Sequence, residues 1–124
     1  MIIGLVGIVA SPEKREDLGR ALFSLLGPIQ VEPGCLSCIL YQDWSDANVL
    51  YIESRWETLN DLIHHILSDT YKRLLLLIEL GVEPPTIEFL TVSEVRGLDF
   101  IEAVRQGFIA TDYTNDIDLH SKSV

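Results

Sequence analysis

The side chains best suited to acid–base chemistry lie together near the middle of the chain, at Trp56, His64, His65 and Tyr71. Histidine has an ordinary pKa of about 6.5, so at neutral pH it can take a proton from a phenolic hydroxyl and later return it. Tryptophan and tyrosine offer flat apolar rings with one polar group each, which suits an aromatic ligand. We therefore take His65, Trp56 and Tyr71 as the candidate catalytic residues, with His65 as the base and the two aromatic residues as binding groups.

Each of these residues also has a purely structural explanation. A histidine on an amphipathic helix can cap the core or face solvent, which explains His65 equally well. A large aromatic side chain at a strand end, such as Trp56, is more often part of the core. Tyr71 lies less than two helical turns after His65, so its hydroxyl reaches the same pocket only if the helix is broken near Ser68.

Four further residues are candidates for substrate binding. Tyr51 and Glu53 alternate along a strand and therefore share one face, where Glu53 either orients a ligand or histidine or is simply solvated. His64 is turned about 100° away from its neighbour His65 by helical periodicity and is more often a surface residue. Trp44 lies in a turn. The sequence does not distinguish between two roles for it, a lid over a pocket and a contact in a dimer.

The two cysteines, Cys35 and Cys38, form a C-x-x-C pair that invites a redox or zinc interpretation. Residues three apart in a regular strand point to opposite faces, so we expect the two thiols to diverge and to be structural. No second Cys or His pair stands at zinc spacing, and no phosphate-binding glycine loop or HExxH pattern occurs. The sequence thus predicts neither a metal nor a bound cofactor.

Composition limits the class of protein. The chain has 124 residues, 48% of them hydrophobic, and a formal net charge of −10. This length suffices for one domain with its own core, and no apolar run is long enough to span a membrane. The negative charge disfavours nucleic acid and anionic lipid surfaces as partners. Two cysteines without a disulfide framework fit a cytoplasmic protein.

The pattern along the chain predicts alternating strands and helices. We expect strands over residues 2–9, 36–42, 49–56 and 86–95, a helix that begins at Ser11-Pro12 and stops at Gly27-Pro28, and a second helix capped by Thr58 that continues toward Leu80. A short helix over residues 98–106 follows. We expect one domain over residues 1–106 and an acidic C-terminal tail over residues 107–124.

This element order, βαββαβ, predicts an α+β protein with a ferredoxin-like antiparallel sheet and both helices on one face. The first strand is apolar on both sides, and Ile39 and Tyr41 lie on the opposite face of the second strand from its other apolar residues. The open face of the sheet therefore needs a cover. A second copy of the chain is the simplest cover, so we expect a homodimer with a cavity beside each sheet.

The order Glu32-Pro-Gly-Cys35, then Trp56, then Asp61-Leu62 followed by His65 and Ser68, resembles the antibiotic biosynthesis monooxygenase family over roughly residues 1–96. The resemblance implies a dimeric α+β barrel of the quinol-monooxygenase type. It also implies an oxidoreductase that works without flavin or metal, with O2 and a hydrophobic aromatic molecule, a quinol or hydroxylated polyketide-like compound, as substrates.

The chain departs from the family pattern at two positions. Some members carry a histidine where this chain has Thr70, so a second acid–base group is not expected. In the heme-degrading branch a histidine ligates iron at the position of Leu75, which disfavours a heme-binding or heme-degrading protein. The other alternative is a non-catalytic small-molecule-binding or stress-response protein with the same dimeric barrel.

Overall fold

The computed structural model describes residues 1–108, and most of the expected tail over residues 107–124 lies outside them. The chain divides into two compact units, Met1–Ser93 and Glu94–Val124. The elements of the first unit are β1 (Ile2–Val9), α1 (Arg15–Gln30), β2 (Cys35–Gln42), β3 (Val49–Trp56), α2 (Leu59–Ile66), α3 (Asp69–Ile78) and β4 (Thr86–Thr91). The predicted domain boundary at residue 106 stays a prediction.

The second unit contains α4 (Leu98–Arg105). Before this helix, Arg96 pairs with Glu94 at 2.9 Å and lies 5.0 Å from the centre of the Phe100 ring. The strand expected over residues 86–95 is shorter than predicted, because β4 pairs with β1 only as far as Thr91. Within the described residues, no helix is both long and apolar enough to cross a lipid bilayer.

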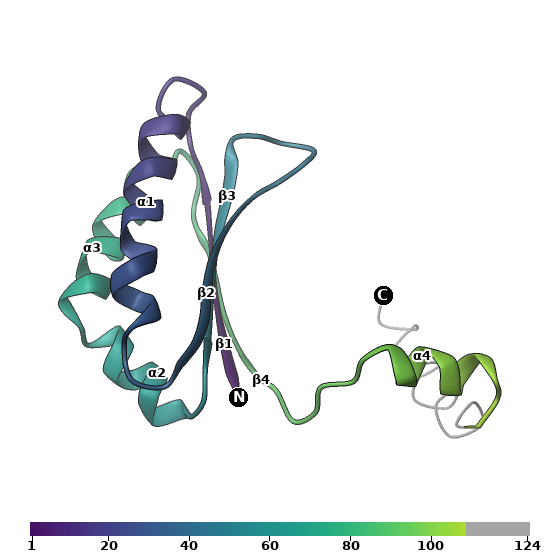
Figure 1. Ribbon diagram of the computed structural model, residues 1–124. Coiled ribbons are helices and arrows are strands. Elements are labelled where there is room, and N and C mark those ends of the chain that lie inside the picture. The colour runs from purple at the N-terminus through teal and green to yellow at the C-terminus, as the bar shows by residue number, and fades with distance from the viewer. Residues whose placement is uncertain (109–124) are drawn as a thin grey trace. The chain divides into compact units, whose positions relative to one another are not determined.

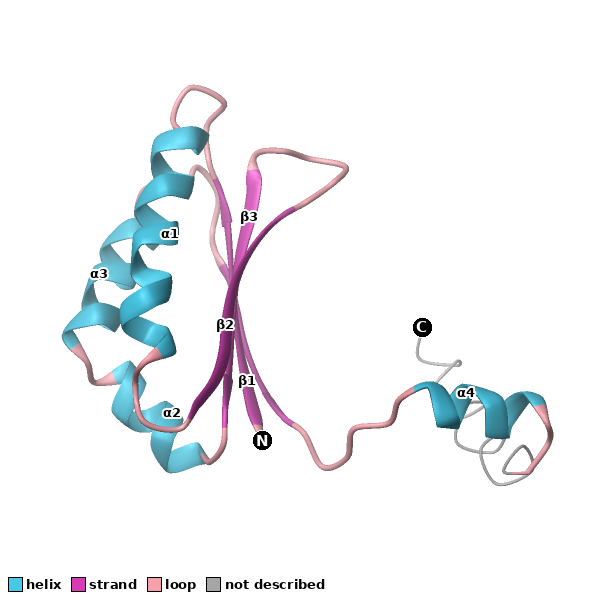
Figure 2. Ribbon diagram, viewed as in Figure 1, coloured by secondary structure: helices cyan, strands magenta, loops and turns pink. Residues whose placement is uncertain are grey.

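The four strands of the first unit form one antiparallel sheet in the order β2-β3-β1-β4. Figure 1 shows the sheet nearly edge-on, with α1, α2 and α3 on one side of it, and Figure 2 shows the same layers coloured by secondary structure. This is the ferredoxin-like α+β fold that the sequence predicted, and the prediction is confirmed.

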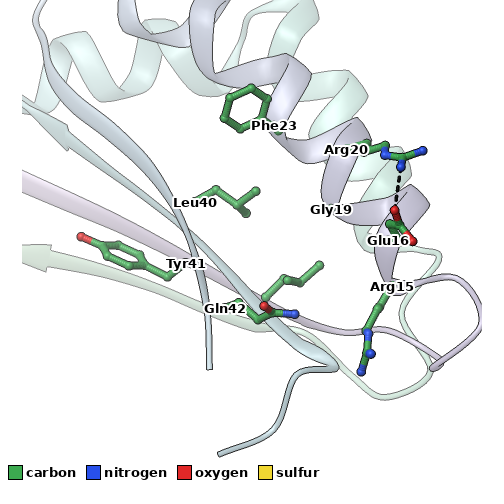
Figure 3. A pocket seen from close by; sticks show the side chains of 9 residues that line it. Arg15, Glu16, Gly19, Arg20, Phe23, Leu40, Tyr41 and Gln42 are labelled. Carbon is green, nitrogen blue, oxygen red and sulfur yellow. Dashed lines mark hydrogen bonds and ion pairs between the residues drawn. The ribbon is translucent and has the colours of Figure 1, made fainter. Parts of the chain in front are cut away.

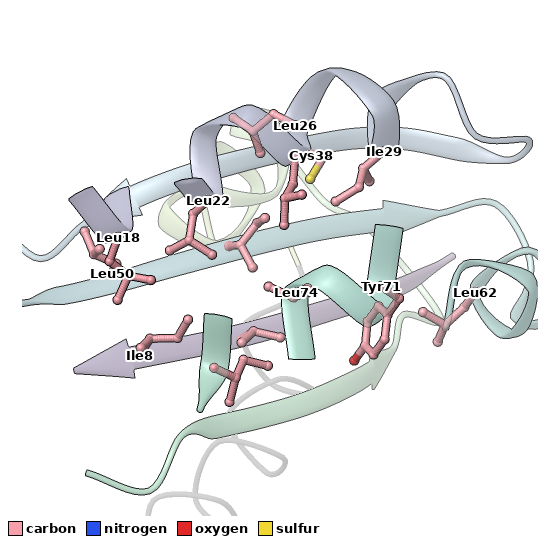
Figure 4. Packing of buried hydrophobic residues seen from close by; sticks show 14 of the residues in the cluster. Ile8, Leu18, Leu22, Leu26, Ile29, Cys38, Leu50, Leu62, Tyr71 and Leu74 are labelled. Atoms are coloured by element: carbon pink, nitrogen blue, oxygen red, sulfur yellow. The ribbon is translucent and has the colours of Figure 1, made fainter. Parts of the chain in front are cut away.

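The hydrophobic core fills the space between the sheet and the three helices. In β1 and β3 the buried residues alternate with half-exposed ones, which is the period of a sheet with one covered face. Helix α1 contributes a stripe of buried residues at helical spacing. Side chains of α1 and α3 meet those of the strands there, for example Leu22, Leu74 and Leu50 (Figure 4).

The other face of the sheet carries apolar side chains that no element of the first unit covers. Ile3 and Leu5 of β1 are half-buried there, and Ile39 and Tyr41 of β2 are 43% and 44% exposed. Leu90 of β4 is 45% exposed and lies directly opposite Ile3. We call this surface the outer face, and the helix-covered surface the inner face.

Helix α1 begins and ends later than predicted. Its first turn is formed by the backbone N–H groups of Lys14 and Arg15, which donate to the Ser11 carbonyl, so Ser11 does not cap the helix with its side chain. At the other end the helix continues through Pro28 to Gln30. A proline inside a helix costs about 3 kcal/mol, but burial of Ile29, which is 1% exposed, favours one more turn.

The predicted divergence of Cys35 and Cys38 is wrong because β2 contains a β-bulge. Cys35 lies opposite Trp56 and Cys38 lies opposite Ser54, while the ladder skips Leu36. Residues directly opposite each other in an antiparallel pair point to the same face. Since Trp56 and Ser54 are both buried on the inner face, both thiols point to that face, and both are free.

The helix expected from Thr58 toward Leu80 is broken near Ser68, the condition that the sequence analysis named for Tyr71 to reach the pocket of His65. Thr58 caps α2 by accepting a hydrogen bond from the Asp61 N–H at 3.1 Å. Helix α2 ends at Ile66, and Ser68 caps α3 by accepting from the Tyr71 N–H, also at 3.1 Å. Each helix therefore starts at its own N-cap.

The loop between α1 and β2 is held against α2 through a glycine. Gly34 has a φ of +78°, a conformation that side-chain-bearing residues rarely adopt. Its carbonyl accepts a hydrogen bond from the Glu57 N–H at 2.9 Å. A Cβ atom at this position would overlap the Asp61 carboxylate. The loop can therefore approach the start of α2 only with glycine at position 34.

Replacement of Gly34 by alanine is expected to lower the free energy of unfolding by about 1–3 kcal/mol, because it combines a strained φ with displacement of Asp61. Gly27→Ala is the matched control, since a Cβ atom at Gly27 in α1 would have no neighbour within 4 Å. That change should stabilise the protein by about 0.5–1 kcal/mol. Urea denaturation of both variants measures the difference, and equal effects would contradict the role given to Gly34.

Candidate functional site

A histidine and a carboxylate meet inside the core, although they lie far apart in the sequence. The Nδ1 atom of His65 is 2.8 Å from Oε2 of Glu32. The His65 side chain is 3% exposed and that of Glu32 is 18% exposed. A carboxylate accepts hydrogen bonds, so Nδ1 carries the hydrogen and donates it to Glu32. The Nε2 atom of a neutral His65 is then the proton acceptor.

Trp56 supports His65 from one side. The two rings are stacked, with centroids 4.4 Å apart and an interplanar angle of 25°. Trp56 is fully buried, and its indole N–H donates to Ser54 Oγ at 2.9 Å. Its ring contact with His65 and its satisfied N–H restrict the imidazole to one orientation.

Tyr71 contacts His65 edge-on, with ring centroids 5.0 Å apart and an interplanar angle of 85°. This contact depends on the break between α2 and α3. The Ser68 hydroxyl donates to the His65 carbonyl at 2.6 Å and accepts from the Tyr71 N–H, so one side chain sets the turn that brings the two rings together. Burial raises the pKa of Tyr71, so its hydroxyl remains protonated at neutral pH.

His65 and Tyr71 line a small cavity between the sheet and the helices. Its walls are mostly apolar, and its polar groups come from Ser54, His65 and Tyr71. The space that a water-sized molecule can occupy is about 10 Å³. That is close to the minimum for one water molecule. The remaining lining residues are Gly4, Val6, Ile29, Cys38, Ile52, Leu62, Leu74 and Phe89.

The low polarity of the cavity sets the charge of His65. Burial lowers the pKa of His65 below its ordinary range, and the Glu32 charge together with its hydrogen bond opposes part of that shift. His65 is therefore neutral at pH 7 and able to accept a proton. A neutral imidazole held by a carboxylate at Nδ1 has the geometry of a general base.

The two thiols near this cavity are poor nucleophiles. Burial raises the pKa of Cys38 to about 12, and burial together with the Glu32 charge raises that of Cys35. The thiolate is the reactive form of cysteine, so neither thiol is activated at neutral pH. Among the described residues, no group of three or more His, Cys, Asp or Glu side chains could hold a metal ion.

Of the seven candidate residues named from the sequence, three come together: His65 and Tyr71 line the cavity, and the Trp56 ring stacks on His65. Tyr51 and Glu53 do not, because they lie on the outer face of β3, where Glu53 pairs with Arg55 at 2.9 Å.

The last two candidates also lie away from the cavity. His64 is exposed on α2, and the Trp44 side chain is fully exposed in the β2–β3 turn. Neither His64 nor Trp44 lines the cavity.

Sequence reasoning did not assign roles to three further residues: Ser54 and Phe89, which line the cavity, and Glu32, which bonds to His65. Glu32 was part of the quoted motif, but nothing in its spacing showed that it would bond to His65. Ser54 alternates with Trp56 on β3, and this shared face was a usable signal for its bond to the indole N–H. Phe89 comes from β4, and only the pairing of β4 with β1 brings it to the cavity.

A second and larger hollow lies away from His65, between α1 and the edge strand β2. It is an open groove of about 560 Å³ with Leu40 and Phe23 on its walls (Figure 3). Its charged side chains include Arg20 and Glu16, which form an exposed ion pair at 2.6 Å. No histidine or cysteine lines it, so it offers no imidazole like that of His65 in the smaller cavity.

The fold and the site together define a class of protein, namely a ferredoxin-like α+β domain with a buried histidine in an aromatic cavity beside its sheet. The family profile described as antibiotic biosynthesis monooxygenase matches residues 1–75. The chain belongs to the antibiotic biosynthesis monooxygenase family. No curated protein matches it.

Solved structures share this fold. Protein PA3566 from Pseudomonas aeruginosa is 27% identical, with a TM-score of 0.66, and the match covers 75% of this chain and 94% of that one. A conserved protein from Methanosarcina mazei is 26% identical, with a TM-score of 0.67 and coverages of 72% and 89%. A candidate antibiotic biosynthesis monooxygenase from Deinococcus radiodurans has a TM-score of 0.72 at 22% identity, with coverages of 79% and 98%.

The Glu32–His65 contact predicts a titration that can be measured. The His65 imidazole should titrate below the ordinary value of about 6.5, and Glu32→Gln should lower its pKa further, because the variant loses the charge that favours imidazolium. Proton NMR of the imidazole Cε1–H resonances measures both, with His65→Gln and His64→Gln used to assign the signals. A His65 pKa that rises in Glu32→Gln would contradict the contact.

Proposed function

We propose that this protein is a cofactor-independent monooxygenase that oxidises a quinol or another hydroxylated aromatic molecule with O2. The observation that carries the proposal is that His65, which is hydrogen-bonded to Glu32, lines an apolar cavity with the Tyr71 ring in edge contact. The family match supports monooxygenase chemistry in general. The substrate class rests on the cavity: a neutral base next to aromatic rings suits a phenolic hydroxyl.

The reaction balances without a further reductant. For a quinol, one oxygen atom of O2 enters the ring and the other leaves as water, while the ring is oxidised to a hydroxyquinone. The substrate supplies all four electrons that O2 takes up. A phenolate passes an electron to oxygen more readily than a phenol does, so removal of the hydroxyl proton is the step that the protein can promote.

His65 accepts this proton at Nε2, and Glu32 stabilises the imidazolium that forms, through Nδ1. Trp56 lies behind His65 and holds its ring in place. The Tyr71 hydroxyl makes no hydrogen bond to a described residue, so it can donate one to a substrate oxygen. Exclusion of water by the apolar walls strengthens each of these interactions and protects reactive oxygen intermediates.

We also propose that the protein works as a homodimer in the cytoplasm, with the second copy on the outer face. The half-exposed apolar residues of that face, including Leu5, Ile39 and Leu90, support this arrangement, since an exposed apolar surface of this kind favours association. Two free cysteines fit a reducing compartment.

Oxygen uptake with a panel of quinols and polyphenols tests the activity. His65→Gln should lower kcat about 10²- to 10⁴-fold, the usual contribution of a general base. His64→Gln is the matched control, since His64 is the exposed neighbour on the same helix and should leave kcat unchanged. Equal rates in the two variants would remove His65 from the mechanism. Binding of quinols without oxygen uptake would favour a non-catalytic binding protein.

Analytical ultracentrifugation at micromolar concentration tests the dimer. The variant Leu5→Lys places a lysine at the centre of the outer face. Leu5 lies directly opposite Glu53 on one side and Glu88 on the other, so Leu5→Lys should be tolerated within one chain. A buried charge would nevertheless disrupt an apolar interface, and the variant should sediment as a monomer. Leu67→Lys, at an exposed position between α2 and α3, is the control that should not change the mass. A monomeric wild type would refute the dimer.

A further inference from the structure

The wall of the cavity beside His65 reaches solvent at one described residue. Every described residue that lines it is buried, except Phe89, which is 46% exposed. A buried residue separates the cavity from solvent by further layers of protein. Phe89 contacts the cavity on one side and solvent on the other, so the shortest path into the cavity passes its ring.

The position of Phe89 in the sheet makes this path physically reasonable. Strand β4 lies at one edge of the sheet, and all of its residues are exposed. Phe89 lies opposite Gly4 of β1, and Ile87 lies opposite Val6, so both side chains point to the inner face. Only Phe89 lines the cavity. A side chain on an exposed edge strand can change its rotamer quickly without movement of the backbone.

The Phe89 ring packs over Gly4 and near Ser54. A Cβ atom on Gly4 would lie at an ordinary contact distance of 3.5 Å from the Phe89 ring, and at 3.1 Å from Ser54 Oγ. Ser54 is in turn the acceptor for the Trp56 indole, so the ring lies close to the residues that hold His65.

The cavity is too small for a ligand unless part of its wall moves. The free space of about 10 Å³ is far below the roughly 150 Å³ cavity that accommodates benzene in a protein core. Ligand pockets are usually larger still, about 300–1,000 Å³. Outward rotation of the Phe89 ring opens the wall at that point and adds a space with the thickness and width of an aromatic ring.

We infer that Phe89 closes the entrance of this cavity and determines which ligands enter it, and that the cavity accepts a flat ligand one aromatic ring in width, which enters edge-on past β4. The nature of this ligand as an oxidisable quinol rests on the proposed function. The entrance itself does not, because it follows from the exposure, position and contacts of Phe89.

Chemical labelling of Cys38 tests the entrance without any assay of activity. Cys38 lines the cavity and is 2% exposed, so an aromatic disulfide such as 5,5′-dithiobis(2-nitrobenzoate) must enter the cavity to react with it. The thiolate attacks one sulfur of the reagent, a mixed disulfide forms, and the thionitrobenzoate that leaves is measured by absorbance. A Cys35→Ser background leaves Cys38 as the single thiol.

In this background, Phe89→Ala is expected to increase the labelling rate roughly tenfold or more, because labelling follows the population of the open form. Ile87→Ala is the matched control, from the same strand and face with 43% exposure but without contact to the cavity. It should change the rate less than about twofold, as expected for a surface substitution. Phe89→Leu, which keeps an apolar side chain, should give an intermediate rate.

Equal rates in Phe89→Ala and Ile87→Ala would overturn the inference, since labelling would then follow general opening of the domain. An unchanged rate in both Phe89 variants would overturn it as well. Oxygen uptake with one-ring and two-ring quinols adds a second measurement, in which Phe89→Ala should raise kcat/KM for the larger compounds relative to the smaller. Faster labelling in a protein without oxygen uptake would support the entrance and refute the proposed monooxygenase.

Discussion

The hydrogen bond between Glu32 and His65 is the interaction on which the site depends. It joins the loop after α1 to the last turn of α2, and both groups are shielded from water to a large degree. A buried polar group without a partner costs more than the pair gains, so each residue requires the other. The pair also fixes the chemistry, because it leaves Nε2 of His65 as the group that can accept a proton. Trp56 and Tyr71 then restrict the imidazole from its face and its edge.

Three local features of the chain position Glu32, His65 and the aromatic rings around them. Gly34 takes a left-handed conformation, so the Glu32 loop can lie against Asp61 at the start of α2. The bulge at Leu36 then turns the start of β2, so that Cys35 lies opposite Trp56 on the inner face. The Ser68 cap ends one helix and starts the next, which returns Tyr71 to His65. The acid–base site is thus a product of loop and cap geometry placed on a regular sheet.

The elements with clear periodicity were predictable from the sequence, and the exceptions were local. Strand β3 was predicted at its observed bounds, because its run of apolar residues directly follows the turn-rich segment 43–48. A helix break near Ser68 was named from the sequence as the condition for Tyr71 to reach the pocket of His65, and the structure has this break. The predicted divergence of the two cysteines was wrong because a β-bulge adds one residue to β2. The predicted end of α1 was wrong because core packing of Ile29 outweighs the cost of Pro28 inside the helix. Glu32 could not be assigned, because a contact between residues 32 and 65 depends on the whole fold.

The two faces of the sheet are linked through the register of β3. Ser54 and Trp56 point toward the cavity, while Glu53 and Arg55 point to the outer face, where they form an ion pair. A slip of one residue would exchange these sets and place a charge pair in the core. The apolar inner residues of β3 therefore stabilise the same register that keeps Tyr51 and Glu53 outside. Substitutions on the outer face can change association without entering the cavity, and the cavity can adapt to a ligand without changing the outer face. The sheet keeps the two faces separate because the side chains of β3 alternate between them along the whole strand.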